Sequence, residues 1–239
     1  MLSDLKLNKV LFLDIETVPI KYNFKELSPV FQKLWEEKTS WQRKDEFTAS
    51  EFYKKKAGLM AEFSKVVCIS VGYLFTEKGE NHFRIKSFYG DEEKELLSEF
   101  ILLLNKEFNT KKHQLCAHNG KEFDFPFLSK RILINDLKLP KLLNIAGKKP
   151  WELNHLDTMD LWRFGDYKNY TSIKLLSELF NIPTPKDDID GSQVSRVYWE
   201  EKDLERIKIY CQKDTITVAQ LLLKYKGEDL IKEENIEFV

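Results

Sequence analysis

Short apolar runs that predict β-strands occur in the first half of the chain. Residues 9–18 ("KVLFLDIETV") read as one strand, and 65–75 ("KVVCISVGYLF") are nearly continuously apolar, as in a central strand covered on both faces. Residues 80–90 alternate after the turn "TEKGE", which predicts a hairpin, and 113–120 ("HQLCAHNG") predict a short buried strand. We expect the first two strands to be neighbours in one sheet.

Segments with helical spacing lie between and after these runs. Residues from about 20 to 63 are rich in Glu, Lys and aromatic residues, and the spacing within 28–38 and 48–63 predicts a helical insertion after the first strand. Further helices are predicted at 91–108, 125–136, 171–181 and 201–227. This order predicts an α/β fold with helices on the faces of the sheet, in a single domain over residues 1–239. The acidic tail "EENIEFV" is expected to fray.

Composition indicates an ordinary globular chain. It has 239 residues and is 42% hydrophobic, which allows a sizeable core. No apolar run reaches the length of a membrane span and no signal-peptide pattern is present, so we expect a cytoplasmic protein that does not bind membranes. The net charge of -1 means that a polyanion must bind through a local patch or a metal. The cysteines, which fit neither a disulfide framework nor a zinc site and are interpreted as small core residues, are Cys68, Cys116 and Cys211.

The first strand carries two carboxylates among apolar residues. Asp14 and Glu16 are two residues apart, so their side chains project from the same face of the strand. Two like charges side by side repel unless a cation or a shared proton intervenes, and a hard divalent metal is their natural partner. The alternative is a pair of acids at a strand end that meets solvent.

A third acidic position lies in "AHNGKEFDFPFL". Asp124 stands between two phenylalanines at the start of a predicted helix, so it either contributes to a site or caps the helix. The preceding Asn119 and Gly120 fall in a turn near the sheet edge, where open α/β sheets bind ligands. His118 in the same stretch is interpreted as a packed or hydrogen-bonded residue.

The last long helix carries a tyrosine and a fourth acid. Tyr210 and Asp214 in "YCQKDTITVAQLL" are spaced i, i+4 on one side of the helix, at the edge of its apolar stripe. A simple hydrogen bond between the two side chains is the alternative to a functional role. The members of the stripe are Ile207, Cys211, Val218, Leu221 and Leu222.

These residues, in this order, resemble a known family. The sequence is similar to the DEDD 3′-to-5′ exonucleases of the ribonuclease H-like fold, in the tyrosine subclass, and above all to bacterial stand-alone predicted exonucleases related to the exonuclease domain of family B DNA polymerases. The blocks that carry the resemblance span residues 10–225 and are "FLDIETVP", "YKKKAGLMAEFSKVVCISVGY", "AHNGKEFDFPFL", "HLDTMDLW", "DDIDGSQV" and "YCQKDTITVAQLL". The histidine subclass would place a His five residues before Asp214, where this chain has Ile209.

The resemblance implies a ribonuclease H-like mixed sheet and a two-metal mechanism at phosphorus. It implies that Asp14, Glu16 and Asp214 hold one divalent ion, Mg²⁺ or Mn²⁺. Asp14 would bridge to a second ion, which Asp124 supports directly or through water. Tyr210, with an ordinary pKa of about 10, would orient the attacking water rather than act as a strong base.

Substrate contacts follow from the same resemblance. The backbone around Thr17 would meet the terminal nucleotide, and Asn119 and Phe123 would line the pocket for single-stranded or frayed 3′ ends. A stacked aromatic ring holds any base without reading sequence, although Phe123 fits equally well as ordinary core. The lysines at 53–58 are interpreted as a solvated helix face, and Asp187, Asp188 and Asp190 as turn residues.

The sequence therefore predicts a metal-dependent 3′-to-5′ exonuclease, with DNA favoured by family likeness. The alternatives are an exoribonuclease that trims short RNA and a catalytically silent nucleic-acid-binding module of the same fold. A glycosidase is a third alternative, but it needs two carboxylates rather than four. We expect no polymerase region to follow, so a role in DNA repair, replication or turnover would need a protein partner or a free end. The insertion would cover the site, shape substrate choice or mediate dimerisation.

Overall fold

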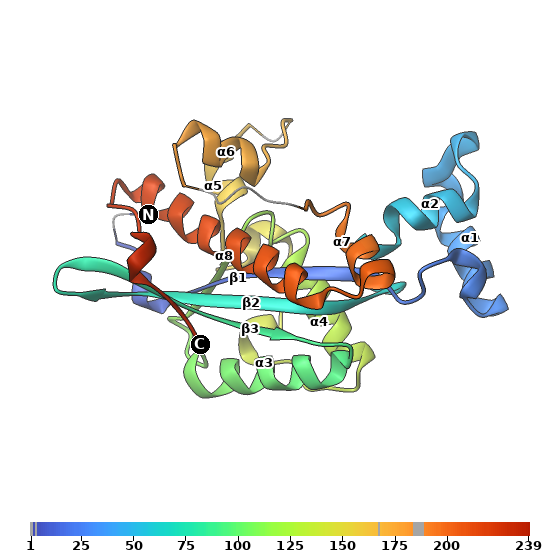
Figure 1. Cartoon of the computed structure of the whole chain (residues 1–239), viewed down its shortest axis with the longest axis horizontal. Helices are drawn as coiled ribbons and strands as arrows, with labels where there is room; N and C mark the ends of the chain where they lie inside the picture. Colours follow the sequence, from blue (N-terminus) through green and yellow to red (C-terminus); the bar gives the residue numbers. More distant parts are fainter. Residues whose placement is uncertain (1, 3, 167, 184–188) are drawn as a thin grey trace.

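A six-stranded sheet lies at the centre of the fold. The computed structural model describes residues 2, 4–166, 168–183 and 189–239 (Figure 1). The strand order is β5-β4-β1-β2-β3-β6, so the two long strands β1 and β2 are neighbours, as predicted. The strands are β1 (Val10–Pro19), β2 (Ser64–Glu77), β3 (Glu80–Tyr89), β4 (Gln114–Ala117), β5 (Leu156–Asp157) and β6 (Ile236–Phe238).

The sheet is mixed. β1 and β3 run antiparallel to β2, whereas β4 is parallel to β1, β5 to β4 and β6 to β3. β2 and β3 form the predicted hairpin. This arrangement, with helices on both faces, is compatible with the ribonuclease H-like fold and confirms the predicted fold class. The helices are α1 (Pro29–Arg43), α2 (Ala49–Lys56), α3 (Glu93–Glu107), α4 (Asp124–Ile134), α5 (Thr158–Arg163), α6 (Ile173–Leu179), α7 (Val194–Arg196), which continues into a π-helical turn (Val197–Glu201), and α8 (Leu204–Lys226).

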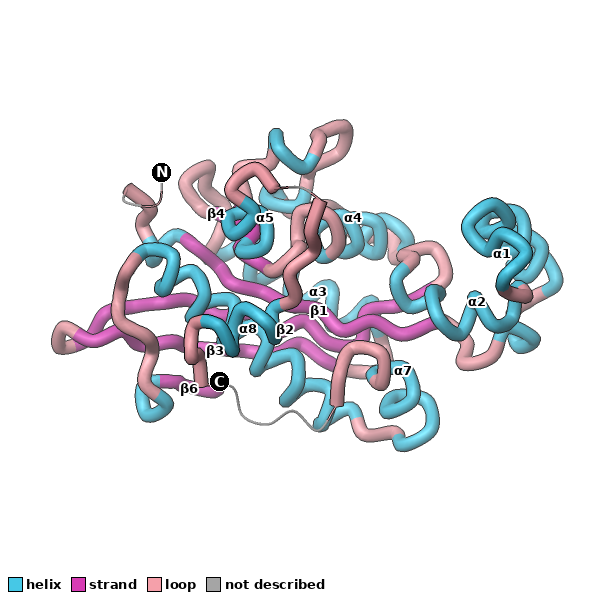
Figure 2. Tube along the Cα trace, turned by 90° about the horizontal axis from the view of Figure 1, so that it is seen from above, coloured by secondary structure: helices cyan, strands magenta, loops and turns pink. Residues whose placement is uncertain are grey.

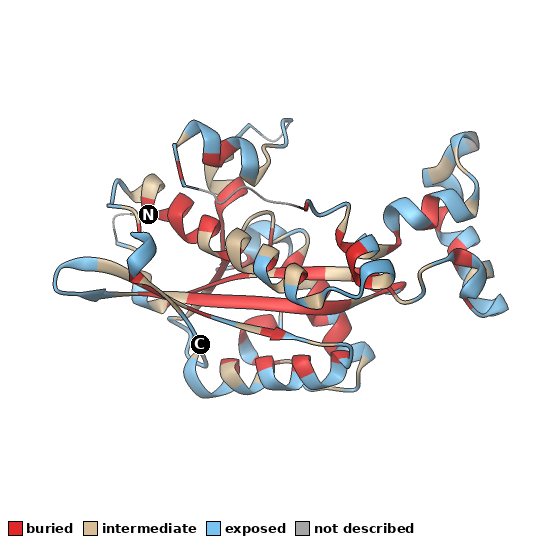
Figure 3. Cartoon of the chain, in the orientation of Figure 1, coloured by how far each residue is buried: buried red, intermediate tan, exposed pale blue. Residues whose placement is uncertain are grey.

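Alternate residues of β1 face two different layers of helices. Leu11, Leu13 and Ile15 pack against α3 and α4, whereas Val10 and Phe12 pack against α8 on the opposite face (Figure 1). β1 and β2 are therefore buried on both sides, which Figure 3 shows along most of their length. The face of β1 that carries Asp14 and Glu16 is thus the face that α8 covers.

The longest helix, α8, has strong signals at both ends. Its 23 residues begin after Asp203, whose carboxylate accepts the Arg206 N–H, and end at Gly227 in the left-handed conformation. All five residues of its predicted apolar stripe are buried. Within the described ranges, no helix combines the length and the apolarity that crossing a bilayer requires.

The residues between β1 and β2 form the predicted helical insertion. α1 and α2 extend beyond the end of the sheet (Figures 1 and 2), and much of their surface is exposed (Figure 3). The insertion has a small aromatic core around Trp35, which packs edge-on against Tyr53 and Phe63 with ring centroids 5.1 and 5.0 Å apart. α2 ends at Lys56, earlier than the amphipathic spacing predicts, because a 3-10 turn (Ala57–Leu59) leads the chain back toward β1.

The expectation of a frayed C-terminus was wrong. Ile236–Phe238 form strand β6, which pairs in parallel with β3 at the edge of the sheet. Asn235 donates to the Glu80 carboxylate at 3.0 Å and fixes the turn that precedes β6. The sequence also did not predict the two-residue strand β5 or the short helix α5.

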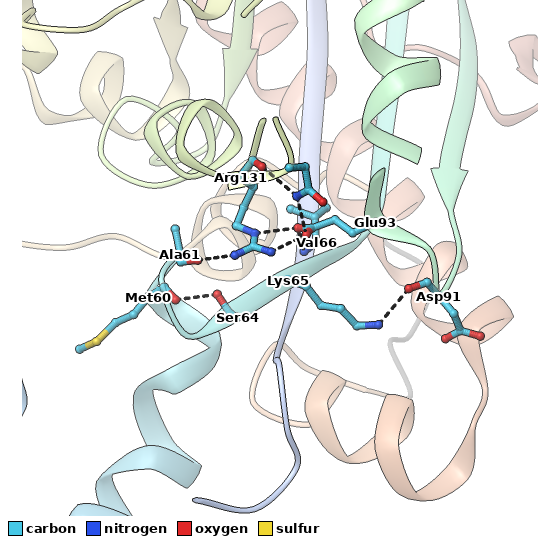
Figure 4. A network of polar contacts seen from close by, with 9 residues as sticks. Met60, Ala61, Ser64, Lys65, Val66, Asp91, Glu93 and Arg131 are labelled. Carbon is cyan, nitrogen blue, oxygen red and sulfur yellow. Dashed lines mark hydrogen bonds and ion pairs between the residues drawn. The ribbon is translucent and has the colours of Figure 1, made fainter. Parts of the chain in front are cut away.

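A buried ion pair joins the end of the insertion to α3 and α4. Arg131 of α4 donates two hydrogen bonds to the Glu93 carboxylate, at 2.8 and 2.5 Å, and a third to the Ala61 carbonyl at 2.8 Å (Figure 4). Glu93 also accepts the Val66 backbone N–H at 2.7 Å. The side chains of Arg131 and Glu93 are 8% and 7% exposed. This network holds α4, and hence its first residue Asp124, against β2.

Replacing Arg131→Ala should lower the free energy of unfolding by about 3–5 kcal/mol, because a buried carboxylate then loses its partner. The Lys33–Glu37 pair on α1 is 77% and 59% exposed, so Lys33→Ala should cost only about 0.5 kcal/mol or less. Urea unfolding of both variants measures the difference. Equal small losses would show that the buried pair does not hold α4.

Candidate active site

Asp14 and Glu16 project from β1 toward α8. Across the ladder Asp14 lies opposite Ser70 and Glu16 opposite Cys68 of β2. The register shifts between Glu16 and Thr17, a bulge of the kind that re-aims side chains beside functional sites. Glu16 is 8% exposed and Asp14 is half-buried. The same-face placement predicted from their spacing is present in the structure.

Tyr210 and Asp214 approach these carboxylates from α8. The Tyr210 hydroxyl donates a hydrogen bond to the Asp214 carboxylate, so the contact considered as the alternative to a functional role is present. The charges of Asp214, Glu16 and Asp14 all act on the Tyr210 hydroxyl, which places the pair beside the β1 acids. The hydrogen bond and the proximity to the other carboxylates therefore occur together.

Asp124 enters the cluster from the first residue of α4. The N-cap position is Phe123, and no side chain caps the helix, so the alternative interpretation of Asp124 as an N-cap was wrong. Its carboxylate instead accepts the backbone N–H of Ile15, between the two β1 acids. The β1–β4 pairing ends at Phe12 and Cys116, which leaves this stretch of β1 accessible to α4.

Burial and mutual repulsion raise the pKa of every carboxyl group in this cluster for which a shift is resolved. Burial, followed by the charges of Glu16, Asp214 and Asp124, raises the pKa of Asp14 well above its ordinary value. Burial, followed by the charges of Asp214 and Asp124, does the same for Glu16. Burial raises the pKa of Asp124 to about 8, against the opposing effect of two backbone N–H donors. The Tyr210 pKa also rises, through burial and the neighbouring carboxylates.

This donor set fits a divalent cation. Asp14 Oδ2 is fully covered and has no hydrogen-bond partner. One ligand atom each of Asp14, Glu16 and Cys211 lie within 4.8 Å of one another. Carboxylate oxygens are the ligands that Mg²⁺ and Mn²⁺ prefer, and a cation would remove the repulsion that raises these pKa values. A bound divalent ion would therefore relieve the repulsion among these carboxylates.

A fifth acid near this edge of the sheet has a different role, which the sequence interpretation missed. Asp157, 2% exposed, accepts the backbone N–H groups of Asn119, Lys121, Met159 and Asp160, so its charge is satisfied by donors. It caps α5 and fixes the turn that leads into α4. The available signal was an Asp directly before an apolar helical segment in "HLDTMDLW".

The turn that Asp157 holds is tightly packed. A Cβ at Gly120 would lie 2.5 Å from that of Ala117, so only glycine fits there. His118 bonds to the Thr158 hydroxyl at 2.9 Å and to the Thr171 carbonyl at 3.0 Å, as its interpretation as a hydrogen-bonded residue predicts.

The three predicted substrate-binding residues occupy different settings. Thr17 donates from its hydroxyl to the Gly58 carbonyl at 2.7 Å, which ties β1 to the end of the insertion. Asn119 adopts a left-handed backbone conformation with φ 63°, and its Oδ1 is buried without a hydrogen-bond partner. Phe123 is half-buried and packs against Phe127 with ring centroids 5.2 Å apart.

The remaining candidates lie outside the cluster. Asp190 accepts the backbone N–H of Ser192 at 2.8 Å, as expected of a turn residue, whereas Asp187 and Asp188 lie outside the described residues. The lysines of α2 are exposed, and Lys55 lies over the Phe47 ring at 4.0 Å, in agreement with a solvated helix face. All three cysteines are free and buried, as predicted.

The sequence match to known proteins agrees with this geometry. Residues 58–234, well over half of the chain, match the family described as predicted 3′-5′ exonucleases related to the exonuclease domain of PolB. The chain belongs to this family. No curated protein was found to match it. The family consists of predicted exonucleases. Exonuclease activity is also what the resemblance in the sequence indicates.

The family match covers only part of the acidic cluster. Asp124, Tyr210 and Asp214 fall within residues 58–234, whereas Asp14 and Glu16 precede them. The structure links the two parts, because β1 pairs with β2 along eight registered positions from Phe12 to Pro19. The cluster is therefore completed by a strand that the family match does not include.

Asp14 and Asp157, two aspartates near this edge of the sheet, should respond oppositely to substitution. A carboxyl whose pKa is raised on folding weakens folding as pH rises above its ordinary value, 3.8 for Asp14. In EDTA at pH 7, Asp14→Asn should raise the free energy of unfolding by about 1 kcal/mol or more, since one pKa unit corresponds to about 1.4 kcal/mol. The gain should vanish toward pH 4, where the wild-type carboxyl is protonated.

Asp157→Asn is the matched control. An amide cannot accept all four N–H groups, so this variant should lose about 1–3 kcal/mol under the same conditions. Urea unfolding in EDTA measures both variants. A loss of stability in Asp14→Asn as large as that in Asp157→Asn would contradict the repulsion described for the cluster.

Proposed function

We propose that the protein is a metal-dependent 3′-to-5′ exonuclease of the tyrosine-type DEDD class that acts on single-stranded or frayed DNA ends. The observation that carries the proposal is the convergence of four carboxylates and a tyrosine from β1, α4 and α8. A stability role does not account for it, because burying like charges together costs free energy. Membership of the predicted exonuclease family supports the same conclusion.

The cluster suits two divalent cations, Mg²⁺ or Mn²⁺. In the proposed site Asp14, Glu16 and Asp214 would hold one ion, and Asp14 and Asp124 would hold the second. When bound, such a pair supplies activation of an attacking water and stabilisation of the leaving 3′ oxygen. The hydrogen bond from Ile15 N–H to Asp124 fixes the fourth carboxylate relative to the β1 acids.

Tyr210 positions the nucleophile in this proposal. Its raised pKa keeps the hydroxyl protonated at neutral pH, so it acts as a hydrogen-bonding group rather than as a base. The Asp214 carboxylate accepts the hydrogen bond from the Tyr210 hydroxyl and so orients the ring. The position where a catalytic histidine would stand instead is Ile209, which is 45% exposed. These features favour the tyrosine subclass.

The substrate is held by groups that do not read sequence. In this proposal the buried, unpartnered amide oxygen of Asn119 lines the nucleotide pocket, and the half-buried Phe123 ring contacts a base. The hydrogen bond from the Thr17 hydroxyl to the Gly58 carbonyl fixes the Thr17 backbone. In this proposal that backbone contacts the terminal nucleotide. The site then binds single-stranded 3′ ends.

A 5′-labelled single strand tests the activity. Incubated with Mg²⁺ or Mn²⁺, it should shorten from its 3′ end to a ladder, and EDTA or Asp14→Asn should abolish the ladder. The matched control is Asp136→Asn: Asp136 is exposed, and its left-handed φ of 58° accepts Asn, so activity should stay at the wild-type level. Comparison of DNA with RNA of the same sequence should show faster shortening of DNA. Intact strands with every metal would contradict the proposal.

Replacing Tyr210→Phe should lower kcat about a hundredfold or more with little change in KM, because only the positioning hydroxyl is lost. Tyr53→Phe is the control, since that hydroxyl donates to the Lys21 carbonyl inside the insertion and should leave kcat unchanged. Steady-state kinetics on a short labelled oligonucleotide measure both. An unchanged kcat in Tyr210→Phe would remove the tyrosine from the mechanism.

A further inference from the structure

A thiol lies among the acids of the proposed exonuclease site. Cys211 follows Tyr210 on α8 and is fully buried, and its Sγ donates to the Asp14 backbone carbonyl at 3.3 Å. The same sulfur lies within 4.8 Å of ligand oxygens of Asp14 and Glu16. Its interpretation as a small core residue is correct for burial but does not describe these contacts.

Two carboxylates at this place lack ordinary partners. Asp14 Oδ2 is fully covered and accepts no hydrogen bond. Glu16 is 8% exposed. Among the described residues, no group donates a hydrogen bond to its carboxylate. The Cys211 thiol is the only donor to the Asp14 side chain among the described residues, so most of the acceptor capacity of the two carboxylates is unused, which indicates a cation as the missing partner. Half-buried Asp14 leaves the cluster open to an entering ion.

The ligand set is not that of a purely hard ion. Oxygen ligands alone suit Mg²⁺ and Mn²⁺, whereas a thiolate favours ions such as Zn²⁺ and Cd²⁺. Tetrahedral zinc bound to sulfur and oxygen at about 2.0–2.3 Å has ligand atoms about 3.5 Å apart. From separations of up to 4.8 Å, the three side chains would need to move inward by only about 1 Å, a shift that small side-chain rotations supply.

We propose that the Cys211 sulfur joins Asp14 and Glu16 in binding a thiophilic divalent cation, Zn²⁺ or Cd²⁺, in competition with the hard ions of the exonuclease site. The inference rests on the proposed function, because both use the same two carboxylates. On binding, the sulfur–metal bond forms, the thiol proton passes to the buffer, and the hydrogen bond from Sγ to the Asp14 carbonyl is lost. A thiophilic ion is then an inhibitor of the Mg²⁺-dependent reaction.

Cadmium provides a direct readout, because a cadmium–thiolate bond absorbs in the near ultraviolet whether or not the protein is active. Titrating the metal-free full chain with Cd²⁺ should produce this band, and excess Mg²⁺ should weaken it. Cys211→Ser should lose the band. Cys116→Ser is the matched control, because Cys116 is equally buried but lies on β4 in the core cluster around Val10 and Phe12.

Circular dichroism checks that each variant is folded. If Cys211→Ser does not fold, Cys211→Ala replaces it, and Asp14→Asn, which keeps every sulfur, should also shift the band to higher Cd²⁺ concentration. A wild-type chain without the band, or a band that persists without Cys211, would overturn the inference.

The two proposals fail separately. Mg²⁺-dependent shortening of DNA without a cadmium–thiolate band removes this inference and leaves the exonuclease. A band without shortening of DNA or RNA under any metal condition removes the exonuclease and leaves the thiophilic site.

Discussion

The repulsion among four carboxylates is the constraint on which the architecture of this protein depends. Asp14 and Glu16 are placed side by side by the period of a strand, and Asp214 and Asp124 are added from helices on either face of the sheet. Among the described residues, Asp14 and Glu16 have no Lys or Arg partner of the kind that Arg131 provides for Glu93. In the proposed function, bound cations would offset the free energy that this arrangement costs.

The rest of the fold can be understood as the support of that arrangement. Burial of β1 on both faces fixes the first two acids, and the capped, deeply packed α8 fixes Asp214 and Tyr210. The Arg131–Glu93 network sets the position of α4, and Asp157 sets the turn that leads into it. Rigid elements therefore carry the proposed catalytic groups, as a two-metal site requires.

Much of this was predictable because it depends on local periodicity. The same-face placement of Asp14 and Glu16 follows from the strand period, and that of Tyr210 and Asp214 from the helix period. Their convergence across about 200 residues is a property of the sheet order, which the family resemblance supplied and periodicity did not.

The short strand β6 was missed because its pairing with β3 is non-local and its sequence neighbours are acidic. Asp124 was ambiguous because a helix start suits a cap as well as a ligand, and only its bond to Ile15 N–H decides. Cys211 looked like core because the apolar stripe does not show which buried atoms face the acids.

We propose that the carboxylate cluster binds divalent cations. Counting Mn²⁺ ions bound per chain, by the loss of the electron paramagnetic resonance signal of free Mn²⁺, tests it without assuming any substrate. The wild-type chain should bind two ions and Asp14→Asn fewer, whereas Asp136→Asn should bind as many as the wild type. Equal Mn²⁺ binding by the wild type and Asp14→Asn would contradict it.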